Sequence, residues 1–220
     1  MIILIPPSEE KASGGTLPPL QELKEPSLSL WNELIETQDE KLLGVKGVAL
    51  ERAITVNKTL LSEKTLPAIE RYTGVVYKGI AYSSLTEQEQ AYINKHVRIV
   101  SALFGLVKPL DPLPEYKLKI DKLGAAKVWR AHTKKELKSE WVIDLLPQAH
   151  RKAVSYENGI KVDFVIEKQG KKVPAGHQGK FIKGRFVRWL AQNNITNPEE
   201  IQKFKEEGFE WVDGCFLKRV

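Results

Sequence analysis

The chain has 220 residues, 42% of them hydrophobic and 28% charged, with a net charge of +6 and an isoelectric point near 9.2. These values predict a globular protein of one large domain, with a core that needs no disulfides. A lone cysteine, Cys215, excludes an internal disulfide framework. No apolar run is long enough to span a membrane, and the first residues lack the features of a signal peptide, so we expect a cytoplasmic protein.

The N-terminal part begins with a short apolar run, Ile2 to Ile5, which predicts a buried strand that ends at two prolines. After an irregular loop and a short helix around residues 30–35, residues 42–54 predict two helices joined by a glycine turn. This segment resembles the helix-hairpin-helix module, whose turn amides bind a phosphate of nucleic acid. Two residues separate Gly44 from Gly47 where the module has one, so an ordinary helical hairpin is the alternative.

The middle of the chain contains the stretch that we expect to organise the fold. Residues 75–85 are β-branched and aromatic, and predict a buried element or an edge strand with Lys78 exposed. Thr86 and Glu89 form a capping box for a helix that runs to about residue 97. Residues 99–107 then predict one buried strand, which delivers Lys108 and Asp111 into a proline-rich turn. Asp111 either belongs to a site at the mouth of the fold or simply closes the turn.

The C-terminal half predicts an alternation of helices and strands. We expect helices at residues 125–141, 179–193 and from Asn197 to Gly208, a strand at 141–146, an antiparallel hairpin of 160–167 with 172–175, and a strand pair within 209–220. Buried runs mixed with hairpins predict the α/β class. We therefore expect a single domain over residues 1–220, with a mixed β-sheet flanked by helices.

The segment from His177 to Leu190 has four cations and no acid. At helical spacing, His177, Lys180, Gly184 and Arg188 fall on one stripe, opposite an apolar face that is expected to pack on the sheet. The glycine would allow a phosphate or a backbone to come close to the helix. Two interpretations remain open: an anion-binding surface, or a basic helix face exposed to solvent.

Four blocks of the sequence resemble the YaaA family of peroxide-stress-resistance proteins. They are PPSEEK (6–11), YTGVVYKGI (72–80), RIVSALFGLVKPLDPLPEYKLKI (98–120) and GHQGKFIKGRFVRWL (176–190). Their order and spacing cover nearly the whole chain. The central block, in which a strand with small residues is followed by a basic residue and Pro-Leu-Asp, is the most specific.

The resemblance implies an α/β domain with a deep basic cleft, DNA binding in the cytosol, and protection of DNA when peroxide meets free iron. Contacts from the basic stripe would go to phosphates, so we expect the DNA binding to be sequence-tolerant. The family positions that carry over are Lys11, Lys78, Lys108, Asp111, Tyr116, Lys180 and Arg188. Lys183-Gly184 stands where family members often have Arg-Gly, which keeps the charge but loses a bidentate donor. The block 144–152 matches only loosely, so no role carries over to His150.

Two classes of function follow. In the first, a basic cleft binds DNA phosphates and performs no chemistry. Its anion-binding residues would be Lys11, Lys78, Lys108, Lys180, Lys183, Arg185 and Arg188. In the second, the same cleft is the active site of an enzyme for a small anionic or nucleotide-like substrate, with Lys108, Asp111 and Ser8 as candidate catalytic groups. The sequence indicates no metal site, no cofactor and no membrane partner, and it does not indicate an oligomeric state.

Overall fold

The short aliphatic run near the N-terminus forms the centre of the main sheet. In the computed structural model, which describes residues 1–220, β1 (Ile2–Ile5) is buried along its whole length. The sheet has the order β4-β3-β1-β6-β7, and β1 pairs in parallel with β3 (Val97–Ser101) and β6 (Trp141–Asp144). A parallel strand that is covered on both faces reads as a continuous apolar run, which is why this strand could be predicted.

The organising stretch is a hairpin, and the prediction of one strand over residues 99–107 was wrong in its second half. β3 ends at Ser101, the chain reverses, and β4 (Gly105–Val107) returns antiparallel to it at the sheet edge. The Ser101 hydroxyl accepts a hydrogen bond from the backbone N–H of Phe104 and closes the turn. Gly105 has φ +69°, and a side chain there would collide with the Trp129 ring. Ser101 and Gly105 therefore mark the place where the chain reverses its direction between β3 and β4.

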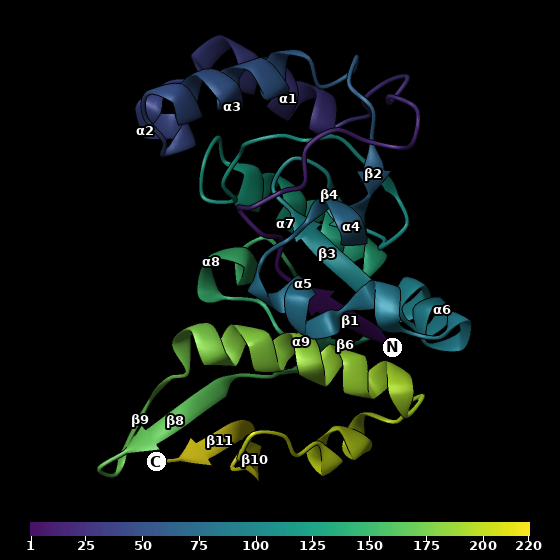
Figure 1. The fold of residues 1–220 in the computed structure, drawn as a ribbon, viewed down its shortest axis with the longest axis vertical. Helices are drawn as coiled ribbons and strands as arrows, with labels where there is room; N and C mark the ends of the chain where they lie inside the picture. The colour runs from purple at the N-terminus through teal and green to yellow at the C-terminus, as the bar shows by residue number, and fades with distance from the viewer.

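Three helices form one end of the molecule, at the top of Figure 1: α1 (Ser27–Thr37), α2 (Glu40–Leu43) and α3 (Val48–Lys58). The predicted pair of helices around a glycine turn is confirmed, and both Gly44 and Gly47 have positive φ. Below them, β2 (Leu66–Pro67) pairs with β5 (Pro112–Leu113). β2 is followed by α4 (Ala68–Arg71).

The segment predicted as a buried element or an edge strand is a helix, α5 (Val75–Ile80), followed by a 3₁₀ turn, η1 (Tyr82–Ser84). The edge-strand interpretation was therefore wrong. β-Propensity is overridden here by helix packing, because Gly79 lies directly against α9 (Gly176–Gln192) and a side chain at Gly79 would collide with its backbone. The capping box of Thr86 and Glu89 is confirmed at the start of α6 (Glu87–His96).

The C-terminal strands form a second mixed sheet, with the order β10-β11-β8-β9. Its strands are β8 (Phe164–Lys168), β9 (Lys171–Pro174), β10 (Glu210–Val212) and β11 (Cys215–Arg219). Both predicted strand pairs are confirmed, although the first part of the predicted 160–167 strand belongs to β7 (Asn158–Lys161) of the main sheet. The segment after Asn197 is the 3₁₀ helix η2 (Pro198–Lys203), capped by the Asn197 side chain as predicted.

Helix α9 lies between the two sheets (Figure 1). Its apolar face packs on a cluster of aromatic rings from the second sheet and the segment after η2: Phe164, Phe204 and Phe216 surround Phe186. The predicted inner face of this helix is confirmed. α7 (Ala125–Glu136) and α8 (Gln148–Arg151) complete an α/β fold with mixed sheets flanked by helices. No helix combines the length and apolar character needed to cross a membrane.

Candidate functional site

The main sheet has a crevice at the carboxyl end of its parallel strands. After β1 the chain continues to β3 on one side of it in the sheet, and after β6 it continues to β7 on the other side. The connections that leave the neighbouring strands β1 and β6 therefore run in opposite directions. Ligands of open α/β sheets bind at such a switch point. A cavity of about 220 Å³ opens here. It is lined by Pro7, Ser8, Glu9, Lys11, Ala102, Tyr116, Lys117, Leu118, Lys119, Ile120, Asp121, Ala149 and His150, and we call it the Lys11 pocket.

Lys11 lies against two aromatic rings at this pocket. Its Nζ atom is 4.7 Å from the ring centroid of Tyr116 and 5.4 Å from that of Tyr72. The two phenol groups share a hydrogen bond of 2.9 Å, and Tyr116 makes another of 2.8 Å with the Ser101 hydroxyl. These buried hydroxyl groups satisfy one another, so the rings have fixed positions and fix the amine in turn.

The Lys11 amine has lost most of its contact with water. Its Nζ donates a hydrogen bond of 3.2 Å to the backbone carbonyl of Ser8, and no carboxylate lies within 4 Å. Burial, together with the neighbouring charge of Lys117, lowers the pKa of Lys11 to about 8. At pH 7 about a tenth of the Lys11 side chains are therefore neutral amines, and a neutral amine is a nucleophile.

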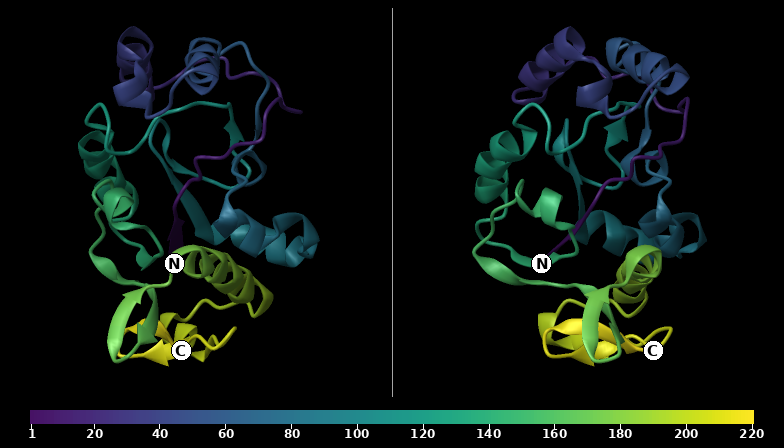
Figure 2. Two further views of the ribbon diagram at one scale, coloured as in Figure 1. Left: turned by 60° about the vertical axis from the view of Figure 1, so that its left-hand side comes forward. Right: turned by 90° about the vertical axis from the view of Figure 1, so that its left-hand side faces the viewer.

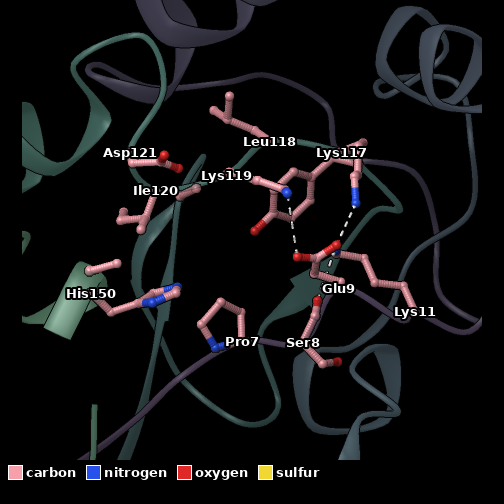
Figure 3. Close-up of a pocket in the computed structure, with 13 residues that line it drawn as sticks. Pro7, Ser8, Glu9, Lys11, Lys117, Leu118, Lys119, Ile120, Asp121 and His150 are labelled. Carbon is pink, nitrogen blue, oxygen red and sulfur yellow. Dashed lines mark hydrogen bonds and ion pairs between the residues drawn. The ribbon is translucent and has the colours of Figure 1, made fainter. Parts of the chain in front are cut away.

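His150 lies across the pocket from Lys11, with Pro7, Ser8 and Glu9 between them (Figure 3). Its Nδ1 atom is buried and has no hydrogen-bond partner. Burial lowers the pKa of His150 to about 4, so the imidazole is neutral at physiological pH. A buried polar atom without a partner is rare in a folded protein, and here it belongs to a residue of the pocket wall.

The rim of the Lys11 pocket carries an ion-pair cluster. Glu9 accepts from Lys117 at 3.0 Å and lies 3.7 Å from Lys119, and these lysines lower the pKa of the Glu9 carboxyl (Figure 3). Lys119 also connects the pocket to the helical hairpin, since a side chain at Gly44 would lie 3.0 Å from its Nζ atom. The hairpin turn and the pocket rim are therefore neighbours.

A second, larger hollow of about 500 Å³ lies on the other side of α8. Ala149 and His150 of α8 line the Lys11 pocket, whereas Gln148 and Arg151 line this second hollow. Its charged residues are Arg151, Lys172, Lys180 and Lys183, with Asp163 as the one carboxylate. The N-terminus of α9 opens into it at Gly176 and Gly179. We call it the basic hollow.

Asp111 has the role of a turn residue. Its Oδ2 atom accepts a hydrogen bond of 2.8 Å from the backbone N–H of Lys108, and its own N–H donates to the Lys108 carbonyl. The Lys108 side chain is exposed. The expected shared cleft does not form, because Lys11, Asp111 and Lys180 line three different hollows.

Ser8 and Lys78 also have structural surroundings that the sequence did not indicate. The Ser8 hydroxyl donates to the Glu10 carbonyl and accepts from the Gly74 N–H, so it holds the loop after β1 in place and has no adjacent base. Lys78 is exposed on α5 and lines a hollow formed with Glu70 and Tyr82. That hollow is distinct from both the Lys11 pocket and the basic hollow.

Three of the four predicted cations of α9 are engaged in structural contacts. Arg188 donates to the carbonyls of Ile80 and Ala81 and to the Ser84 hydroxyl. Arg185 pairs with Glu206 at 2.5 Å, and Lys183 donates to the Leu145 carbonyl at 2.8 Å. Gly184 admits the backbone of α5, so of the two expected uses of this glycine, close approach of a backbone is the one that the structure shows. Of the four cations, Lys180 is exposed.

Replacing Asp111 with alanine is expected to lower the free energy of unfolding by about 1 kcal/mol, because it removes one hydrogen bond that closes the turn. Asp111→Asn keeps a side-chain oxygen acceptor and should have a smaller effect. Urea denaturation of both variants measures this. A loss of DNA binding or of an activity in Asp111→Asn, with unchanged stability, would contradict the structural role.

Sequence reasoning missed two residues. Arg71 is completely buried and donates to the backbone carbonyls of Leu113, Ala12, Gly14 and Lys64, which fixes the segment that follows Lys11. His150 was left without a role, although its position soon after a buried strand was a signal for the carboxyl edge of the sheet. No group of three or more His, Cys, Asp or Glu side chains is placed to hold a metal ion.

Comparison with known proteins gives a consistent match. A family model described as peroxide stress protein YaaA matches residues 1–214. A UPF0246 protein of Corynebacterium glutamicum is 31% identical to this chain, and the alignment covers 87% of this chain and 85% of that protein. A UPF0246 protein of Corynebacterium efficiens is also 31% identical, and the alignment covers 91% of this chain and 87% of that protein. A UPF0246 protein of Agathobacter rectalis is 28% identical over 68% of this chain. This chain covers 66% of the length of the Agathobacter rectalis protein and 64% of the length of a UPF0246 protein of Finegoldia magna.

Proposed function

Since the chain belongs to the family of peroxide stress protein YaaA, we propose that it binds DNA during the peroxide stress response, through contacts to phosphates. The observation that carries this proposal is the basic hollow. Four cations surround one carboxylate there, at the N-terminus of a helix of 17 residues that has no acid in its first turn. Backbone N–H groups and the helix dipole at such an end favour phosphate.

The charges of the hollow divide into two kinds. Arg151 is held by Asp144 and Asp163, and Lys183 by the Leu145 carbonyl. Lys172 and Lys180 are exposed, and the only acid within 4 Å of Lys172 is Asp213, at 4.0 Å. The exposed pair can turn towards a ligand without breaking a buried contact, so we assign the phosphate contacts to Lys172 and Lys180.

The helical hairpin supplies a second contact on the same side of the molecule. α2, α8 and the β8–β9 hairpin follow one another from top to bottom along the left of Figure 1, and this side faces the viewer in the right-hand view of Figure 2. Lys46 in the hairpin turn is 82% exposed, and Gly47 leaves open space around the first turn of α3. A duplex lying along this side would pass over both hollows.

Contacts to phosphates position a duplex but do not read its sequence, so binding should tolerate any sequence and weaken steeply with salt. The variant Lys172→Ala/Lys180→Ala is expected to reduce the slope of log affinity against log salt by about 2, at roughly 0.9 per phosphate contact. Fluorescence anisotropy with a short labelled duplex at several salt concentrations measures the slope.

The matched control is Lys95→Ala/Lys203→Ala, which removes the same charge from α6 and η2. The control should keep the slope of the unmodified protein. Equal slopes in both double variants would place the DNA elsewhere, and no binding at low salt would refute the proposal.

A further inference from the structure

The Lys11 pocket has features that phosphate binding does not require. Its amine lies over two tyrosine rings, with no carboxylate within 4 Å, and its opposite wall has a neutral imidazole whose Nδ1 atom lacks a partner. A phosphate-binding lysine keeps its charge and extends towards solvent. A desolvated lysine is instead the form in which this side chain acts as a nucleophile towards carbonyl groups.

We propose that the Lys11 pocket captures an aldehyde of abasic or oxidised deoxyribose in DNA, with the Lys11 amine forming a covalent imine with the aldehyde carbon. This inference rests on the proposed DNA binding. Radicals formed from peroxide remove bases from DNA and leave sugars whose ring-opened form has an aldehyde at C1′. The substrate class therefore agrees with the name of the family.

The size and position of the pocket agree with such a ligand. Its volume of about 220 Å³ is below the roughly 300–1,000 Å³ of pockets for drug-sized ligands, so one sugar unit is a suitable occupant. The basic hollow and the pocket are both lined by α8, and the hairpin turn approaches Lys119 at the pocket rim. DNA bound along this side would have its backbone on either side of the pocket mouth.

The covalent step needs no oxidant and no metal. The lone pair of the neutral amine forms a bond to the C1′ carbonyl carbon, and the electrons of the C=O π bond move to oxygen, which takes up a proton from solvent. The nitrogen gives up one proton, which leaves a neutral carbinolamine with a lone pair on nitrogen. That proton returns to the hydroxyl oxygen, which leaves as water as the C–O bond breaks and the nitrogen lone pair forms the C=N bond. The products are a protonated imine and one water molecule.

His150 is suited to exchange the protons of this sequence. A neutral imidazole can accept a proton from the attacking nitrogen through water and can return it by the same route to the departing oxygen. Asp121 lines the same pocket and its charge favours the imidazolium form of His150. We therefore assign His150 as the proton-transfer group and Lys11 as the nucleophile.

Borohydride trapping tests the proposal, because it reduces an imine to a stable secondary amine. The probe is a duplex with a single abasic site, made by excision of uracil, and the control duplex is intact. We expect a covalent protein–DNA adduct with the abasic duplex only, and peptide mapping should place the modification on Lys11. Mapping uses the unmodified protein, so this readout does not depend on a variant that folds.

Two matched variants add to the mapping. Lys11→Arg keeps a cation but cannot form an imine, and it should lower adduct yield at least tenfold. Lys95→Arg makes the same change on α6, away from the pocket, and should keep the yield. Anisotropy with the intact duplex is measured in parallel. Normal DNA binding without an adduct, or an adduct mapped to another lysine, overturns the inference and leaves DNA binding standing. Loss of binding to both duplexes refutes the proposed function as well.

The rate of trapping should rise with pH. The groups whose charges act on the Lys11 amine are Glu9, Arg71, Glu115 and Lys117. The amine is protonated below its pKa of about 8 and becomes a nucleophile as the pH rises through that value. Initial rates of adduct formation between pH 6.5 and 9 should therefore increase and level off above about 8. A rate that is constant or falls over this range would contradict the assignment of a desolvated lysine.

Discussion

Replacing Arg71 with lysine is expected to lower the free energy of unfolding by about 3–5 kcal/mol. The guanidinium is completely buried and donates to four backbone carbonyls from three segments. A lysine side chain has a single nitrogen, which cannot lie within hydrogen-bond distance of all four carbonyl oxygens. Each buried carbonyl that is left unpaired costs about 1–3 kcal/mol.

Arg52→Lys is the matched control, because Arg52 is 59% exposed and its contact is a surface ion pair with Glu115. Such pairs contribute about 0–1 kcal/mol. Urea denaturation followed by tryptophan fluorescence measures both variants. If Arg71→Lys changes the free energy of unfolding no more than the control does, Arg71 does not hold the loop after Lys11.

Gly184→Ala is the second substitution with a large expected effect. An alanine Cβ would lie 2.0 Å from the Val76 carbonyl oxygen and 2.8 Å from the Gly79 Cα atom, and both of these are backbone atoms of α5 that cannot turn away. Separating α9 from α5 should lower the free energy of unfolding by about 3 kcal/mol or more.

The sign of this effect is informative. Helix propensity alone favours alanine over glycine by about 1 kcal/mol, so a helix free of close contacts would become more stable. Gln192→Ala, at an exposed position in the last turn of α9, serves as the control and should change stability little. A thermal denaturation midpoint for Gly184→Ala at or above that of the unmodified protein would contradict the packing of α5 on α9.

The predictable parts of this fold are those in which local chemistry decides the structure. β1 could be predicted because a strand covered on both faces has only aliphatic residues, and α6 because Thr86 and Glu89 satisfy each other's backbone N–H groups. The stretch 99–107 was mistaken for one strand because small residues suit a buried strand and a tight reversal equally. α5 was mistaken because its helical state depends on a partner that is about 100 residues away in sequence.

The candidate site was less predictable for the same physical reason. Lys11 and Tyr116 were identified from the resemblance, but the burial of the Lys11 amine depends on Tyr72 and Tyr116 meeting across the fold. The α9 cations could be identified from the sequence, but their partners could not be predicted. Arg188 donates to backbone carbonyls at the end of α5, and Arg185 pairs with the Glu206 carboxylate. Periodicity places side chains on a helix face and does not indicate which charges are already neutralised.

The central claim is that one side of the molecule, from the helical hairpin past the Lys11 pocket to the basic hollow, is the DNA-binding surface. Hydrogen–deuterium exchange with and without a duplex tests it most directly. We expect slower exchange in residues 40–50, 116–121 and 171–180, with little change in α6 and η2. Slower exchange confined to α6, η2 or the opposite side of the molecule, with those three segments unaffected, would contradict the account.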